Sequence, residues 1–229
     1  MPAENFFYNI LVPLILALMP VALLLLYFWK TDKGEKEPWK LMRRAFIWGV
    51  LVVFPVVIVE VGLHFGFYSI PNLTPLYFIV GPFFLIALPE ELGKFWVVKR
   101  KIFDHAKFNE VMDGINYTVV ASLGFAALEN IMYIYAYDLE IGVLRAFTAV
   151  PAHALFSGLM GYKIGRAKFE KNKKKRNQLL RQGLWAAVFF HGLYDFLLMS
   201  GEPLLIFMIF PLLFVMWRML HNRIRLAHR

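Results

Sequence analysis

Long apolar stretches are the feature that most constrains how this chain folds. A helix crosses the bilayer core with about 20 predominantly apolar residues, and stretches such as residues 6–29 and 45–68 reach that length. The 229 residues are 59% hydrophobic and only 18% charged, which is more apolar than a soluble domain. In lipid only helices and closed barrels satisfy their backbone hydrogen bonds, and these stretches are too long for barrel strands. The sequence therefore predicts an all-α, polytopic membrane bundle that forms one domain over residues 1–229.

The placement of the basic residues predicts how the helices cross the membrane. We expect about seven transmembrane helices, at residues 6–29, 45–68, 76–98, 110–136, 141–162, 183–200 and 203–220. With the N-terminus outside, all 25 Lys and Arg residues except Arg145 fall on the cytoplasmic side, and the C-terminus is cytoplasmic too. The first stretch lacks a small-residue cleavage site, so we expect it to remain as a span.

Charge and cysteine content exclude further classes of function. The formal net charge is +9, but the run KNKKKR belongs to a loop that we place on the cytoplasmic side. Such a loop contacts anionic lipid, so we expect the lipid bilayer as a partner and no nucleic acid. The chain has no cysteine, which excludes disulfides, thiolate metal sites and a cysteine nucleophile.

Ionisable residues inside apolar helices are the candidates for function, because each costs about 2.5–3.5 kcal/mol or more to insert. Four expected helices each carry at least one of them in a pair of residues at i and i+4, which lie on one helix face. These pairs are Glu90 and Lys94, Phe125 and Glu129, His153 and Ser157, and His191 and Asp195, with Glu91 beside the first. The pair Glu60 and His64, near the outer end of another helix, is interpreted as structural.

The depth of these residues follows from their distance to the cytoplasmic boundary, at about 1.5 Å per residue. Glu90, His153 and His191 come out level with one another. Glu129 comes out about 9 Å nearer the outer face, so a bend near Gly124 or a later helix start is needed to bring it level.

Acids and imidazoles that converge at one depth suit hydrolysis. A carboxylate shielded from bulk water, here Glu90, acts as a general base toward water, and an imidazole stabilises the oxyanion. Lys94 keeps one carboxylate of Glu90 and Glu91 ionised beside its neighbour, and Asp195 orients the ring of His191. The sequence contains neither GxSxG nor HExxH. Water is therefore the expected nucleophile.

The four motifs, in this order, resemble the PrsW family of intramembrane proteases, a distant branch of the clan of CAAX prenyl endopeptidases. They are EELGK, FAALE followed by Asn130, HALFS and HGLYD, and residues 111–131 are similar throughout. The resemblance covers residues 76–200. The CAAX branch has EExxxR and FxxxH where this chain has EExxK and FxxxE, which argues against a prenylated CAAX substrate.

The resemblance implies a protease of the bacterial plasma membrane that cuts a single-span membrane protein. In the family's best-known role the substrate is an anti-sigma factor, and the cut begins the proteolysis that releases an envelope-stress sigma factor. Two alternatives stay open on the residues alone. Chains of Glu, His and Asp in membranes also form the proton relays of transporters, and a scaffold without activity can keep a polar bundle.

The residues also leave two mechanisms open. In the first, Glu90 activates water without a metal and the histidines stabilise the oxyanion. In the second, Zn²⁺ is held by Glu90, His153 and His191. Glu129 is a weaker candidate as a ligand because of its estimated depth.

Overall fold

The computed structural model describes residues 10–71 and 74–228, and all regular structure within them is helical. This confirms the all-α prediction. In chain order the elements are α2 (Val12–Thr31), α3 (Trp39–Tyr68), α4 (Thr74–Val80), the π-helical segment η2 (Gly81–Ala87), α5 (Leu88–Lys101), α6 (Val111–Ala136), α7 (Leu139–Phe147), α8 (Ala149–Phe169), α9 (Lys173–Met199), α10 (Pro203–Phe207) and α11 (Ile209–Ala227).

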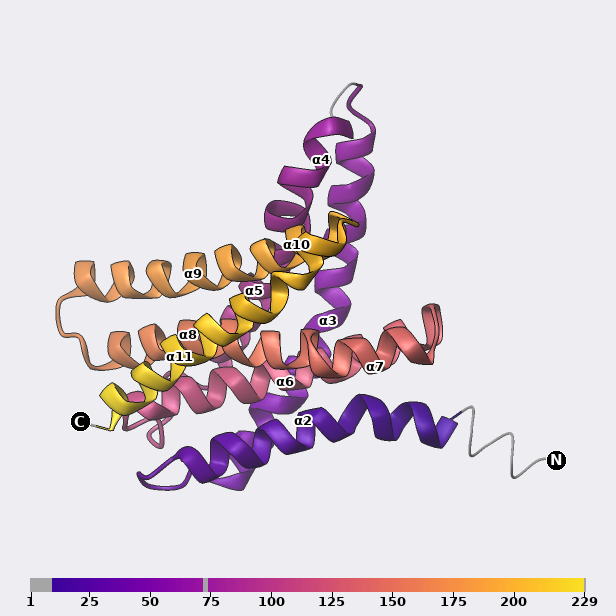
Figure 1. The fold of residues 1–229 in the computed structure, drawn as a ribbon. Helices are drawn as coiled ribbons and strands as arrows, with labels where there is room; N and C mark the ends of the chain where they lie inside the picture. The colour runs from indigo at the N-terminus through magenta and orange to yellow at the C-terminus, as the bar shows by residue number, and fades with distance from the viewer. Residues whose placement is uncertain (1–9, 72–73, 229) are drawn as a thin grey trace.

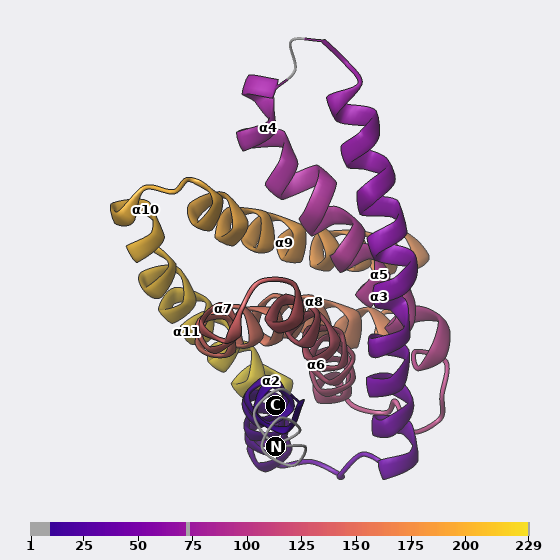
Figure 2. The ribbon, with the colours of Figure 1, turned by 90° about the vertical axis from the view of Figure 1, so that its right-hand side faces the viewer.

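The helices α6 and α8 form the centre of the bundle. They pack against each other more extensively than any other pair among the described elements, and most of their residues are buried. The helices α2, α6, α8 and α9 run alongside one another, while α3 and the α4–α5 segment cross them (Figures 1 and 2). The outer helices α2, α3 and α11 expose mostly apolar residues, such as Ile58 and Phe65 on α3. That surface suits contact with lipid tails.

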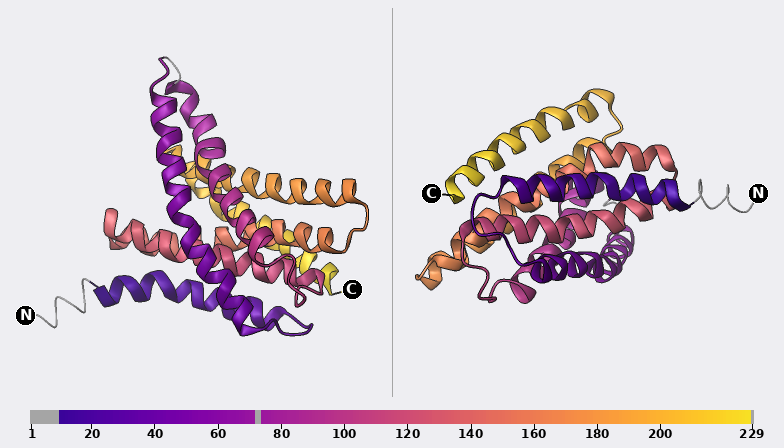
Figure 3. Two further views of the ribbon diagram at one scale, coloured as in Figure 1. Left: turned by 180° about the vertical axis from the view of Figure 1, so that it is seen from behind. Right: turned by 90° about the horizontal axis from the view of Figure 1, so that it is seen from below.

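The loops that carry most of the basic residues lie at one end of the bundle. The α2–α3, α5–α6 and α8–α9 connections and the end of α11 gather there, whereas α2 begins at the opposite end (Figure 1). The view from behind shows the same grouping, and the view from below shows α2 lying along α6 (Figure 3). This segregation is the arrangement that the charge pattern predicts.

Six helical segments of the described residues are long and apolar enough to span a membrane: Val12–Thr31, Trp39–Tyr68, Leu76–Lys101, Val111–Ala136, Leu139–Phe169 and Pro203–Ala227. The seventh expected span, residues 183–200, is helical but falls within α9, which is not among the six. Its first half is strongly basic and its second half carries His191 and Asp195, and both lower its hydropathy. Polar residues that are candidates for function therefore lower the hydropathy from which a membrane span is recognised.

Prolines shape the two helices that precede the site residues. The expected helix 141–162 is broken at Thr148 into α7 and α8. Pro151 explains the break, since its ring clashes with the carbonyl four residues earlier, that of Phe147. Ahead of α5, the Leu88 N–H donates to the carbonyl of Phe83, five residues back, in the wider turn of η2. Pro82 and Pro89 flank this turn, and each lacks the N–H that an α-helical bond requires.

Glycines allow the close approach of α6 and α8. The sequence spacing of Gly158, Gly161 and Gly165 predicts close helix packing, and a Cβ atom built on Gly161 would lie 2.4 Å from the carbonyl oxygen of Gly114. A Cβ on Gly165 would lie 2.2 Å from the carbonyl oxygen of Val111. The two backbones therefore touch, which fixes where α8 places His153 relative to α6.

We expect Gly161→Ala to destabilise the fold by about 1–3 kcal/mol, the usual cost of overpacking. Gly66→Ala on α3 is the matched control, because a Cβ there meets nothing within 4 Å among the described residues. The control should leave stability unchanged or raise it slightly, since alanine favours helix over glycine. Thermal unfolding of both variants in detergent tests this. Equal melting temperatures would contradict the close packing.

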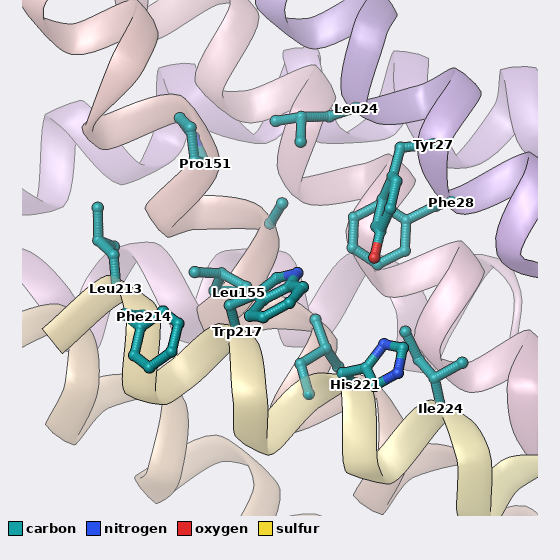
Figure 4. Close-up of a pocket in the computed structure, with 12 residues that line it drawn as sticks. Leu24, Tyr27, Phe28, Pro151, Leu155, Leu213, Phe214, Trp217, His221 and Ile224 are labelled. Atoms are coloured by element: carbon teal, nitrogen blue, oxygen red, sulfur yellow. The ribbon is translucent and has the colours of Figure 1, made fainter. Parts of the chain in front are cut away.

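An apolar cavity of about 290 Å³ lies beside α8 (Figure 4). It is bounded by α2, α8 and α11, and its walls include Leu24, Pro151, Leu155 and Trp217. Its α8 residues, Pro151, Ala154 and Leu155, flank His153 in the sequence without including it. The helix α8 therefore separates an apolar side from a polar one.

Candidate active site

The ammonium group of Lys94 is the centre of a buried polar cluster. Lys94 is fully buried, and its Nζ donates to Glu90 Oε2 at 3.0 Å and to Glu91 Oε1 at 2.8 Å. A third contact, of 2.8 Å, joins Nζ to Nδ1 of His153 on α8. The ring of Phe125 on α6 lies 4.3 Å from Nζ. Lys94 therefore balances the negative charge of both glutamates, whereas the sequence predicted that it keeps one of them ionised. It also contacts His153.

His191 on α9 is held mainly by Glu91 and by an aromatic ring. Its Nδ1 lies 3.0 Å from Glu91 Oε1, and its ring stacks on Phe156 with centroids 4.8 Å apart. Asp195, which the sequence predicts to orient this ring, lies 3.4 Å from Nε2. Its Oδ2 is buried and has no hydrogen-bond partner within the described part of the chain. Glu91 therefore orients His191, and Asp195 adds charge nearby.

Glu129 reaches His153 without the bend that the depth estimate required. The helix α6 is continuous, yet Glu129 Oε2 lies 2.8 Å from Nε2 of His153. Side chains lean toward the N-terminus of their own helix. Because α6 and α8 run in opposite directions, these two side chains lean toward each other. The depth estimate compared only backbone positions, so it left out this approach of the two side chains and no bend is needed for their contact.

The structure thus brings all the predicted site residues into one network from α5, α6, α8 and α9. Their catalytic roles remain predictions. The sequence reasoning missed Arg145, whose Nη2 lies 2.8 Å from Glu129 Oε2 as an ion pair. The available signal was that Arg145 is the one Lys or Arg residue that the charge pattern assigns to the outer side. Phe156, which stacks on His191, was hidden among the other apolar residues of α8.

The expected Glu60–His64 pair has a different form. His64 Nδ1 contacts the main-chain carbonyl of Glu60 at 2.7 Å, and its Nε2 contacts the Tyr77 hydroxyl at 2.9 Å. His64 therefore joins α3 to α4, as a structural residue does. The side chain of Glu60 is not part of this pair. Its Oε1 is buried without a hydrogen-bond partner among the residues described.

The donor atoms of the cluster fit a divalent metal. Glu90, Glu91, His153 and His191 are all buried and offer one ligand atom each, within 4.8 Å of one another. This set contains the three expected ligands, adds Glu91 and omits Glu129. Glu91 Oε2 is buried and unpaired in the described residues, so the protein alone does not use all the donor capacity. Lys94 contacts three of these four residues, and a metal at the same position must therefore displace its ammonium group.

Comparison with known proteins identifies the family of the chain. The family model described as PrsW family intramembrane metalloprotease matches residues 37–220, which include every candidate site residue. The chain belongs to the PrsW family. Hydrolysis is therefore favoured over proton-coupled transport and over an inactive scaffold, the two alternatives that the residues alone left open.

Curated relatives agree over most of their length. Protease PrsW of Geobacillus kaustophilus is 40% identical over 188 residues, which are 80% of this chain and 78% of the relative. Protease PrsW of Bacillus subtilis is 33% identical over 198 residues, 86% of this chain and 88% of the relative. No solved structure matches the chain. The protein is an intramembrane peptidase with several membrane-spanning helices, and its bacterial relatives place the family in the plasma membrane.

Proposed function

We propose that the protein hydrolyses a peptide bond of a single-span membrane protein of the anti-sigma factor type, as the first cut of regulated proteolysis. The observation that carries the proposal is the convergence of Glu90, Glu91, His153 and His191 inside a bundle with a lipid-facing surface. A bond must enter the membrane region to reach these buried groups, and a single transmembrane segment is a substrate that already lies there. The family's best-known role, noted above, supplies the anti-sigma class.

In the metal-free form of the proposed mechanism, Glu90 takes the proton from the attacking water. Glu90 Oε2 and His191 Nε2 are 3.9 Å apart, too far for a direct hydrogen bond, and a water held by both is the nucleophile. Lys94 and His191 balance the negative charge that develops on the substrate carbonyl oxygen. Protonated Glu90 then delivers its proton to the leaving amine. Glu91 fixes Lys94 and His191 in place through its two hydrogen bonds.

The donor set further supports Zn²⁺ as the metal, with Glu90, His153 and His191 as its main ligands. If bound there, zinc would supply a water whose pKa is lowered toward about 7. We expect purified protein to contain about one zinc per chain and to lose it in His153→Ala and His191→Ala. Elemental analysis, together with activity after chelation and zinc add-back, checks this. Full activity in metal-free protein would support the metal-free alternative instead.

The function itself is tested in liposomes that contain the protein and single-span membrane proteins, including an anti-sigma factor from the same bacterium. We expect one defined cut in or next to the transmembrane segment of the anti-sigma factor. The Glu90→Gln variant is the control for contaminating proteases. Cleavage of a different single-span protein alone would refute the anti-sigma class and retain the reaction. Cleavage of soluble protein alone would refute both.

We expect the N-terminus outside and the C-terminus in the cytoplasm, because the basic loops share one end of the bundle. Reporter fusions after Asp138 and after Lys173 test this. The fusion after Asp138 should be active outside and the fusion after Lys173 inside. The opposite pair of results would reverse the proposed topology.

A further inference from the structure

Arg145 is a buried cation that the mechanism above does not use. It lies on α7, only 9% exposed, with its guanidinium carbon 3.7 Å from the centre of the Tyr133 ring. Its Nη2 is 2.8 Å from Glu129 Oε2. A guanidinium group withdrawn from water costs free energy unless a partner compensates for it, so the pair with Glu129 is the reason that Arg145 can lie there.

The fold brings α7 back onto α6 to form this pair. A Cβ atom built on Gly142 of α7 would lie 2.0 Å from the side chain of Ile134 on α6, so only glycine permits the approach. The side-chain amide of Asn130, next to Glu129, donates to the carbonyl oxygen of Gly142 at 3.5 Å. After the break at Thr148, α8 carries His153 to the same carboxylate. Arg145 and His153 consequently approach the same carboxylate from two helices.

The proton positions in this network follow from the donors. A lysine ammonium has only donors, so Nδ1 of His153, 2.8 Å from Lys94 Nζ, is an acceptor without a proton. The proton of the neutral ring is therefore on Nε2, which donates to Glu129 Oε2 at 2.8 Å. As an anion, Glu129 accepts this bond and also balances the charge of Arg145. One carboxylate oxygen thus joins Arg145 to His153.

We propose that Arg145 is a positioning residue that acts through Glu129 to keep His153 in the Nε2–H tautomer with Nδ1 facing the cluster. This arrangement serves the cluster equally whether Nδ1 meets the Lys94 ammonium or a metal, because in both cases Nδ1 must be free of a proton. The effect on catalysis rests on the proposed function. The tautomer of His153 does not.

The tautomer is measured directly by nitrogen NMR of metal-free, full-length protein labelled with ¹⁵N-histidine. The chain has six histidines, and a His153→Gln variant assigns the signals of His153. We expect an unprotonated Nδ1 in the wild type and a shift toward a mixture of tautomers in Arg145→Gln. Arg223→Gln is the matched control, since Arg223 also lies over a tyrosine ring, that of Tyr162 at 5.3 Å. Unchanged His153 signals in folded Arg145→Gln would overturn the proposal.

Proteolysis gives the second readout. We expect Arg145→Gln to lower kcat about 10- to 100-fold with little change in KM, the usual loss for a residue behind a functional histidine. Arg145→Lys should recover part of the rate because it keeps the charge. The double variant with Glu129→Gln should be no slower than the slower single variant, since both act through one contact. If the loss of kcat in the double variant equals the product of the two single losses, Arg145 does not act through Glu129.

The two readouts separate the two proposals. A shifted tautomer in a protein that cuts no membrane protein would refute the proposed function and retain the role of Arg145. A normal tautomer of His153 in Arg145→Gln, together with impaired proteolysis, would refute the role of Arg145 and retain the proposed function. If Arg145→Gln fails to fold, Arg145→Lys supplies the NMR test. We then expect the wild-type tautomer of His153, and an altered tautomer would contradict the proposal.

Discussion

We expect Glu90→Gln to abolish proteolysis while the protein still accumulates in the membrane. The amide keeps the shape of the side chain but accepts no proton from water, and loss of a general base alone costs about 10²–10⁴-fold in rate. The amide also removes the negative charge that faces the Lys94 ammonium, 3.0 Å from the present carboxylate oxygen. Cleavage of a single-span substrate in liposomes, with equal amounts of folded protein, measures the loss.

Glu60→Gln is the matched control for this prediction, because it makes the same change at another intramembrane glutamate. No hydrogen bond of the Glu60 carboxyl oxygen Oε1 is lost, since this buried atom has no partner within the described structure. The variant should therefore keep most of its activity. Equal inactivation of the two variants would show that the network does not mark the boundary of the functional site.

Lys94→Met has the largest expected effect on stability. Methionine has nearly the same length but leaves Glu90 and Glu91 buried side by side without their cation, and removing one partner of a buried ion pair costs about 3–5 kcal/mol. Thermal and denaturant unfolding of the metal-free protein measure this. Added zinc should stabilise Lys94→Met more than the wild type, because zinc then needs to displace no ammonium group.

Lys107→Met is the control, since Lys107 pairs with Glu35 on an exposed surface at the basic end. An exposed pair contributes little to stability, so this variant should unfold like the wild type. Equal destabilisation of the two variants would contradict the buried ion-pair network. Equal stabilisation of Lys94→Met and wild type by zinc would show that metal and ammonium occupy different positions.

Hydropathy and motif spacing predicted the fold class and the residues that converge. Apolar length alone identifies α2 and α3, and the distances to the cytoplasmic boundary placed Glu90, His153 and His191 at one depth, in agreement with the cluster that they form. These inferences succeed because helical geometry relates sequence distance directly to position along one helix. Family resemblance then favoured proteolysis over the other functions that buried ionisable residues allow, a proton relay or an inactive scaffold.

Contacts between helices could not be predicted in the same way. The pairing of Glu129 with His153 depends on the direction of two side chains in antiparallel helices, and the burial of Arg145 depends on the return of α7 at Gly142. The choice of Glu91 over Asp195 as the partner of His191 depends on how α5 and α9 cross. Each is a property of packing between separate segments, which spacing along one segment does not contain.

The spread of the network along the chain has a consequence for biosynthesis. Glu90 is made early and His191 comes a hundred residues later on α9, so a ribosome must complete most of the protein before Glu91 finds its imidazole partner. A nascent chain that has inserted α2 to α8 contains the carboxylates of the cluster on α5, together with Lys94 and His153, but it lacks His191. Under the proposed function, we therefore expect a chain that ends before α9 to be inserted in the membrane and yet to cut no membrane protein.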